Sequence, residues 1–170
     1  CEAAGVPFRS VPKLQDLMSG KVRINELREV SIEDLLGRDP VTLDWQAIRQ
    51  ELGDHTVLVT GGGGSIGSEL CRQLARLQPK RLVVLDNSEY KLYRIQMELV
   101  QSFPDLELQC HLGDVTDRPY IEDVFARHCP QVVFHVAAYK HVPLLEPQIR
   151  QAMRNNVLGT RNVAELSDRT

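Results

Sequence analysis

The sequence predicts an α/β fold with a doubly wound parallel sheet, of which it contains the N-terminal half, preceded by a short helical arm. Short apolar, β-branched runs typical of buried strands alternate with segments whose apolar residues recur at helical spacing. The connections between them are short, which favours parallel strands covered by helices on both faces. This alternation begins at residue 55 and is absent from the first 54 residues.

Four strands and four helices are expected in the alternating part. The run at 56–59 is apolar and β-branched, and Leu70, Leu74 and Leu77 recur at helical spacing after it. Asp117 can cap a later helix. The strands are expected at 56–59, 81–85, 106–112 and 132–136, and the helices at 65–77, at 88–103, from 117 onward and at 148–167.

The chain is expected to divide into an arm at 1–54 and a domain at 55–170. Short helices are predicted in the arm at 13–19, 32–36 and 45–52, the last of them capped by Asp44. The chain starts with Cys1 rather than methionine and ends within a predicted helix. We therefore expect it to be an excerpt of a longer protein.

The composition is ordinary for a soluble globular domain. Of 170 residues, 42% are hydrophobic and 25% charged, and the formal net charge is −3. This charge gives no reason to expect a nucleic-acid partner. No apolar run approaches the roughly 18 residues of a membrane span, and the segment at 1–4 is not expected to be part of a signal peptide, because no basic start is followed by an apolar stretch. The four scattered cysteines are expected to be free thiols, and the five scattered histidines indicate no metal site.

A glycine-rich turn lies between the first strand and the first helix of the domain. Gly61, Gly64 and Gly67 are three residues apart, the pattern that allows a tight turn, close approach to a pyrophosphate and close helix–strand packing. Ser65 and Ile66 begin the helix, whose free N–H groups favour phosphate. These five residues are predicted to bind a dinucleotide on a Rossmann-like fold. The alternative is a flexible glycine loop, and the lack of Gly-Lys-Ser/Thr disfavours a Walker-type loop.

Acidic residues follow the second and third strands. Asp86 lies about 20 residues after the last glycine, where a carboxylate accepts from the adenosine ribose and repels a 2′-phosphate. With Asn87 and Ser88 beside it, Asp86 favours NAD over NADP. Asp114 and Val115 are predicted at the adenine end. The alternatives are that Asp86 and Asp114 only cap the helices that follow.

Small residues and then two cations follow the fourth strand. Ala137 and Ala138 allow a ligand to come close, and with Tyr139 they are predicted to contact the cofactor. Lys140 and His141 are predicted to bind substrate, because ligands of such sheets lie outside the strand ends. Asn156, on the last helix, is the third predicted substrate residue. The alternative for all three polar side chains is simple solvent exposure.

No catalytic residue is predicted in this chain. Short-chain oxidoreductases use a tyrosine, or a substitute for it, four residues before a lysine. None of the four tyrosines in this sequence has a lysine at that spacing. We expect the acid–base chemistry to lie downstream, outside the chain.

Together these motifs resemble one family. The runs at 59–69, 85–89, 137–143 and 155–160, and the linker at 28–38, look like the capsular polysaccharide biosynthesis group of nucleotide-sugar 4,6-dehydratases and epimerases. This group belongs to the extended short-chain dehydrogenases/reductases. The resemblance spans nearly all of the chain, whereas the glycine motif alone would indicate only the superfamily.

The resemblance implies a larger enzyme of which this chain is a truncated piece. The start of the chain looks like the tail of an upstream domain, preceded by membrane-spanning helices that would anchor a cytoplasmic domain to the inner membrane. The missing downstream part would carry a Met/Tyr-x-x-x-Lys segment and bind the sugar. A homo-oligomer is also implied.

The implied reaction acts on UDP-N-acetylglucosamine or a close relative. It oxidises C4, eliminates water across C5–C6 and reduces C6, with NAD regenerated in each turnover. One alternative is a C4 epimerase, and another is a non-catalytic dinucleotide-sensing module. The fragment alone is predicted to be inactive.

Overall fold

The computed structural model of this chain describes residues 9–10, 28–29 and 43–169. The chain forms two compact units, Cys1–Leu43 and Asp44–Thr170. In the first, strands β1 (Arg9–Ser10) and β2 (Arg28–Glu29) form an antiparallel pair. The helices predicted at 13–19 and 32–36 lie outside the described residues.

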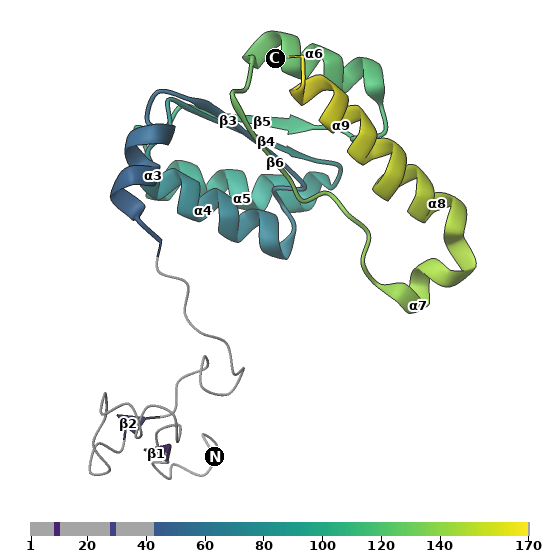
Figure 1. The fold of residues 1–170 in the computed structure, drawn as a ribbon, viewed down its shortest axis with the longest axis horizontal. Coiled ribbons are helices and arrows are strands. Elements are labelled where there is room, and N and C mark those ends of the chain that lie inside the picture. Colours follow the sequence, from purple (N-terminus) through teal and green to yellow (C-terminus); the bar gives the residue numbers. More distant parts are fainter. Residues whose placement is uncertain (1–8, 11–27, 30–42, 170) are drawn as a thin grey trace, which may run out of the picture. The chain divides into compact units, whose positions relative to one another are not determined.

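The second unit is built on a four-stranded parallel sheet, which confirms the predicted fold class (Figure 1). Its spatial order is β5-β4-β3-β6, and every neighbouring pair is parallel. The first strand of the unit, β3, therefore lies inside the sheet. The next two strands along the chain, β4 and β5, extend the sheet on one side of β3, and β6 pairs with its other side. The strands are β3 (Thr56–Thr60), β4 (Arg81–Asp86), β5 (Leu108–Leu112) and β6 (Val132–His135).

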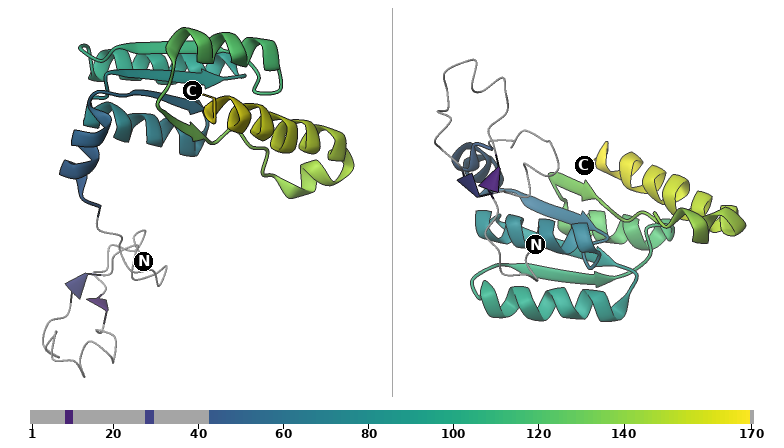
Figure 2. Two further views of the ribbon diagram at one scale, coloured as in Figure 1. Left: turned by 45° about the horizontal axis from the view of Figure 1, so that its top comes forward. Right: turned by 90° about the horizontal axis from the view of Figure 1, so that it is seen from below.

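Helices cover both faces of the sheet, as Figures 1 and 2 show. Helices α4 (Ser65–Leu77) and α5 (Glu89–Ser102) pack on the face of Val57 and Val59. Helices α6 (Arg118–His128) and α9 (Thr160–Ser167) pack on the face of Leu58. Because successive strand residues point to opposite faces, the continuous apolar run of β3 supplies both cores.

Helix α3 (Trp45–Leu52) forms as predicted and belongs to the second unit. The Asp44 carboxylate caps it by accepting from the N–H groups of Gln46 and Ala47. Leu52 is buried in the core beneath α4, and Ile48 packs against the same core. The compact unit therefore begins eleven residues before the predicted domain start at residue 55.

The segment after β6 differs most from the prediction. Helix α7 (Val142–Leu145) and a 3-10 turn, η2 (Glu146–Gln148), were not expected. The predicted helix at 148–167 is divided into α8 (Ile149–Met153), the π-helical segment η3 (Arg154–Gly159) and α9. Strand β5 starts two residues later than predicted, because the N–H of Leu106 bonds within a turn to Phe103. Periodicity alone does not detect a π segment, which adds a residue to one turn without changing composition.

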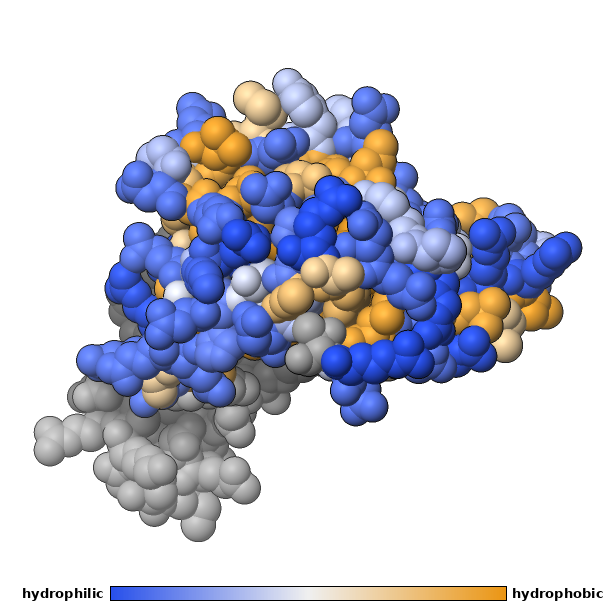
Figure 3. Space-filling model, turned by 90° about the horizontal axis from the view of Figure 1, so that it is seen from above, coloured by the Kyte–Doolittle hydropathy of each residue, from blue (hydrophilic) through white to orange (hydrophobic). Residues whose placement is uncertain are grey.

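Apolar side chains are exposed where α7 and α8 lie, at the right-hand end of the view in Figure 3. Val142, Leu144, Ile149 and Met153 are each more than half exposed. None of the helices in the described part of the chain is long and apolar enough to cross a membrane.

A pair of histidines between β5 and α6 makes the stability of the fold depend on pH. The Nε2 atoms of His111 and His128 lie 2.7 Å apart, and His111 Nδ1 lies 3.3 Å from the Tyr120 hydroxyl. Burial holds the pKa of each histidine below its ordinary value of 6.5. The unfolded chain therefore binds protons more readily than the folded one, so the stabilisation is present above pH 6.5 and is lost as the pH falls below it.

We expect the free energy of unfolding to fall between pH 7.5 and pH 5.5, because two charged rings cannot share one N–H···N bond. Urea denaturation at a series of pH values measures this. The double variant His111→Phe, His128→Leu should have a shallower dependence on pH. An unchanged slope in that variant would contradict the explanation.

Candidate functional site

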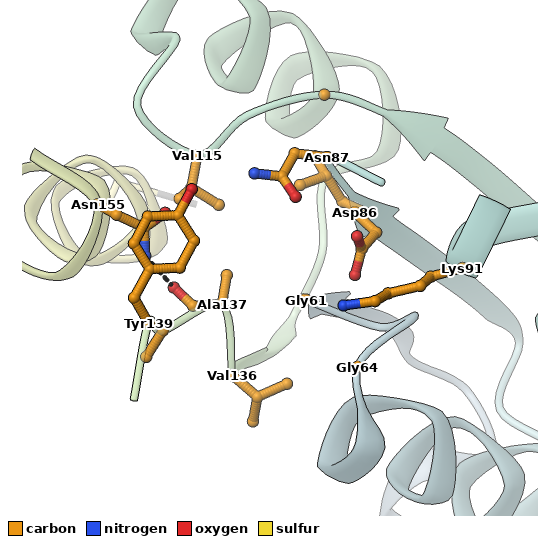
Figure 4. Close-up of a pocket in the computed structure, with 13 residues that line it drawn as sticks. Gly61, Gly64, Asp86, Asn87, Lys91, Val115, Val136, Ala137, Tyr139 and Asn155 are labelled. Carbon is orange, nitrogen blue, oxygen red and sulfur yellow. Dashed lines mark hydrogen bonds between the residues drawn. The ribbon is translucent and has the colours of Figure 1, made fainter. Parts of the chain in front are cut away.

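Two adjoining hollows lie at the carboxyl ends of β3, β4 and β6. The smaller, of about 140 Å³, is drawn in Figure 4, and the larger has about 720 Å³. Both are lined by Gly61 and Gly64 of the glycine turn and by Ala138 and Tyr139 of the loop after β6. The two hollows therefore form one continuous site outside the strand ends, where ligands of doubly wound sheets bind.

The glycine turn is packed closely against backbone atoms, most clearly at Gly61 and Gly67. Gly61 has φ +69°, and a Cβ on it would lie 2.8 Å from the backbone of Ala137. A Cβ on Gly67 would lie 2.1 Å from the carbonyl oxygen of Gly61. Gly61 therefore lets the turn pass against the loop after β6, and Gly67 lets α4 start directly beneath the turn.

The start of α4 presents backbone donors to the larger hollow. Ser65, Ile66 and Gly67 all line it. Their N–H groups have no acceptor within the helix, and the N-cap residue Gly64 has no side chain to satisfy them. With the positive end of the helix dipole, this arrangement suits a phosphate. The residues present thus fit the predicted seat of a dinucleotide pyrophosphate.

Asp86 ends β4, and its carboxylate holds the backbone of the glycine turn and of the residues before α5. One carboxylate oxygen accepts from the N–H of Gly63 at 2.9 Å, and the other accepts from the N–H of Ser88 at 2.8 Å. The residue is 6% exposed but lines the smaller hollow with Asn87. A carboxylate has about four acceptor positions, so one oxygen can still accept from a ribose hydroxyl. Asp86 thus supports the glycine turn and faces the hollow at the same time.

Lys91, in the first turn of α5, was not predicted. It lines both hollows, and Figure 4 shows its amino group pointing toward Asp86 and the glycine turn. The amino group adds a positive charge beside the predicted phosphate and ribose positions. Its place in the first turn of the helix after Asp86 is the signal that sequence reasoning overlooked.

The loop after β6 lies as predicted, with one further residue behind it. Ala137 lines the smaller hollow and Lys140 and His141 line the larger one. Asn155, also unpredicted, is buried, lines the smaller hollow and donates to the Ala137 carbonyl at 3.0 Å (Figure 4). The signal for it was the Asn-Asn pair, of which only the second member was selected. Of the other predicted residues, Val115 lines the smaller hollow.

Three predicted residues do not line either hollow. Asp114 accepts from the N–H of Thr116 at 2.8 Å, so it shapes the turn before α6. Ser88 is the N-cap residue of α5. Asn156 uses its amide on the backbone of Tyr139, with both hydrogen bonds 2.9 Å long. Contacts of these three side chains with a ligand stay predictions.

Two of the three cysteines in the described part of the chain, Cys71 and Cys110, are held as neutral thiols. Burial raises the pKa of Cys71 to about 12 and that of Cys110 to about 11, so neither thiol ionises near neutral pH. Across residues 43–169, His, Cys, Asp and Glu side chains nowhere gather in a group of three that could hold a metal ion. The polar groups that line the two hollows are backbone donors, one buried carboxylate, the hydroxyls of Ser65 and Tyr139, amides and cations.

Residues 57–170 match the sequence family described as Polysaccharide biosynthesis protein. The chain belongs to this family. It is 44% identical over 166 residues to the capsular polysaccharide biosynthesis protein CapD of Staphylococcus aureus, covering 97% of the chain and 28% of CapD. It is 41% identical over 169 residues to the probable polysaccharide biosynthesis protein EpsC of Bacillus subtilis (strain 168), covering 99% of the chain and 28% of EpsC. The chain thus spans 28% of the length of these two curated relatives.

More distant relatives include nucleotide-sugar dehydratases and epimerases. A dTDP-D-glucose 4,6-dehydratase of Dictyostelium discoideum is 30% identical over 118 residues, covering 69% of this chain and 27% of the relative. The crystal structure of UDP-glucose-4-epimerase from Stenotrophomonas maltophila, with bound NAD and formylated UDP-arabinopyranose, has a TM-score of 0.57 and 26% identity. It covers 67% of this chain and 33% of the epimerase. The NAD bound in that epimerase supports a nicotinamide dinucleotide as the cofactor of this chain.

The packing of the turn predicts the effect of a single methyl group. In Gly67→Ala, the new Cβ would meet the Gly61 carbonyl oxygen, so we expect overpacking to cost about 2 kcal/mol or more of stability and NAD affinity to fall. Gly53→Ala is the matched control, since Gly53 follows α3 at φ −56° and its Cβ would approach only the Arg49 carbonyl, at 3.2 Å. Thermal unfolding with and without NAD compares the two variants. Equal stability of both would refute the close-packing argument.

Proposed function

We propose that this chain is the NAD(P)-binding part of a UDP-N-acetylhexosamine 4,6-dehydratase in surface polysaccharide biosynthesis. The observation that carries the proposal is the continuous site in which the glycine turn, Asp86 and the Tyr139–His141 loop face one another. The membership of the polysaccharide biosynthesis family supports the pathway, and the dehydratase among its relatives supports the reaction.

Each part of the site has a role in this proposal. The first N–H groups of α4 hold the pyrophosphate, with Lys91 as an added positive charge. Asp86 accepts from the adenosine ribose. Lys140 and His141 line the larger hollow beside the helix start, and there they bind the UDP-sugar.

When bound, NAD supplies a hydride acceptor for C4 of the sugar and later a hydride donor for C6. The described residues position both molecules, and the close approach of the Gly61 and Ala137 backbones brings the cofactor seat next to the loop after β6. None of the four tyrosines precedes a lysine by four residues, so we assign the acid–base residues to a part of the protein outside this chain.

A C4 epimerase is the second candidate, because a UDP-glucose 4-epimerase of Rickettsia massiliae is 32% identical over 114 residues, covering 65% of this chain and 32% of the relative. Both reactions begin with oxidation at C4 and need the same cofactor seat. They differ in whether the hydride returns to C6 or to C4, which the residues of the cofactor seat do not determine.

The reaction is tested on the whole protein with UDP-N-acetylglucosamine. We expect mass spectrometry to show a product lighter than the substrate by one water. A product of unchanged mass with inverted C4 would support the epimerase instead. NAD binding without any turnover by the whole protein would leave the sensing module as the explanation and refute both enzyme proposals. The 170-residue chain alone should show no turnover.

Lys140 is tested in the same assay. Removing a charge-assisted hydrogen bond costs about 1.5–3 kcal/mol, so we expect Lys140→Met to lower kcat/KM about tenfold or more. Arg161→Met removes the same charge from the exposed side of α9, where Arg161 pairs with Glu165 at 3.3 Å, and should have little effect. Equal kcat/KM values for the two variants would exclude Lys140 from the substrate site.

The preference for NAD is tested at Asp86. A carboxylate there repels a 2′-phosphate, so Asp86→Asn should narrow the ratio of the NAD and NADP affinities measured by calorimetry. The control Asp123→Asn removes one negative charge on α6, where Asp123 pairs with Arg127 at 2.6 Å. Wild-type protein that binds NADP as tightly as NAD would show that Lys91 outweighs Asp86 at this position.

A further inference from the structure

The end of β6 carries a histidine whose two ring nitrogens are both hydrogen-bonded. Nδ1 of His135 lies 2.7 Å from the Thr60 hydroxyl oxygen, and Nε2 lies 3.0 Å from the Thr160 hydroxyl oxygen. Thr60 and His135 are register partners on neighbouring parallel strands. The imidazole therefore connects the last residue before the glycine turn with the first residue of α9.

The partners of His135 determine which of its nitrogens carries the proton. A hydroxyl has one hydrogen to donate, and Thr160 donates its hydrogen to the Asn156 carbonyl oxygen, 2.7 Å away. Thr160 must then accept from an Nε2–H group of His135. In a neutral ring Nδ1 is left as an acceptor, and it takes the hydrogen of the buried Thr60 hydroxyl. Burial lowers the pKa of His135, because it disfavours the charged ring, and so preserves this arrangement.

The chain of hydrogen bonds continues from Asn156 to the loop that lines the site. The Asn156 side chain accepts from the backbone N–H of Tyr139 and donates to its carbonyl, both at 2.9 Å. Asn156 lies in the π-helical segment η3, directly before α9. The loop after β6 is thus hydrogen-bonded to η3 through Asn156. From η3 the hydrogen bonds run through Thr160 and His135 to Thr60, the residue before the glycine turn.

The geometry points to His135 as a positioning residue that couples the two hollows of the site, in its neutral form with the proton on Nε2. A ligand that shifts the glycine turn acts on Thr60, and through His135 and Thr160 it acts on the Asn156 carbonyl and the Tyr139 backbone. The identities of the two ligands, a dinucleotide and a uridine nucleotide sugar, rest on the proposed function. The direction of the hydrogen bonds does not.

Nitrogen NMR of the ¹⁵N-labelled chain tests the direction of the bonds. At pH 7 we expect His135 to be protonated on Nε2 and unprotonated on Nδ1. Thr60→Val removes the hydrogen donated to Nδ1, so it should shift the Nδ1 resonance more than the Nε2 resonance, and Thr160→Val should do the reverse. A ring protonated on Nδ1 would overturn the proposal.

Calorimetry on the whole protein tests the coupling. We expect NAD to raise the affinity for UDP-N-acetylglucosamine about fivefold or more, the lower end of the usual coupling between sites. In Thr160→Val, which keeps the side-chain volume, this enhancement should fall toward one. Ser167→Ala is the matched control, because its hydroxyl donates to the Val163 carbonyl oxygen four residues earlier, at 2.8 Å on the same helix. That control should keep the full enhancement.

The outcomes separate this proposal from the proposed function. An enhancement that stays unchanged in Thr160→Val and His135→Phe, or is absent from the wild type, would make His135 a purely structural histidine. If His135→Phe does not fold, Thr160→Val still tests the coupling, because Thr160 is exposed and its substitution leaves the core intact. If the wild type binds NAD but no UDP-sugar, the proposed function fails, and the NMR measurement alone decides on the direction of the bonds.

Discussion

The site depends on a close backbone contact between two segments that follow neighbouring strands. A Cβ on Gly61 would lie 2.8–2.9 Å from backbone atoms of Val136 and Ala137, so only glycine allows β3 and β6 to end side by side with their loops touching. Parallel pairing in register brings Thr60 level with His135 just before this contact. Because the glycine turn and the loop after β6 are in contact, residues of both segments line both hollows.

Around this contact, several polar side chains bond to backbone groups. The Asp86 carboxylate accepts from two backbone N–H groups, and the amides of Asn155 and Asn156 hold the loop after β6. A buried donor or acceptor that loses its hydrogen-bond partner destabilises the folded protein. These hydrogen bonds therefore hold the loops in one conformation before any ligand arrives, and preorganisation of this kind reduces the cost of binding.

Local rules predicted the strands, most helices and the glycine turn, because periodicity, capping and turn chemistry act over a few residues. The cap of α3 by Asp44 is an example. The same rules missed α7 and the π-helical η3, whose conformations depend on what the loop after β6 contacts. They also missed Lys91, which belongs to no recognised motif, and Asn155, whose neighbour Asn156 was selected instead. Both reach the site from helical segments whose positions the fold sets.

By itself, the sequence determined the α/β class, the position of the glycine turn and the resemblance to polysaccharide biosynthesis enzymes, because each rests on short motifs whose residues are close together in the chain. Only the tertiary structure decided that Asp86 supports the turn as well as facing the ligand site, and that His135 bonds to Thr60, 75 residues earlier. The physical reason is that a hydrogen bond requires two atoms within about 3 Å. For Thr60 and His135, so far apart in sequence, the in-register pairing of β3 with β6 sets that distance.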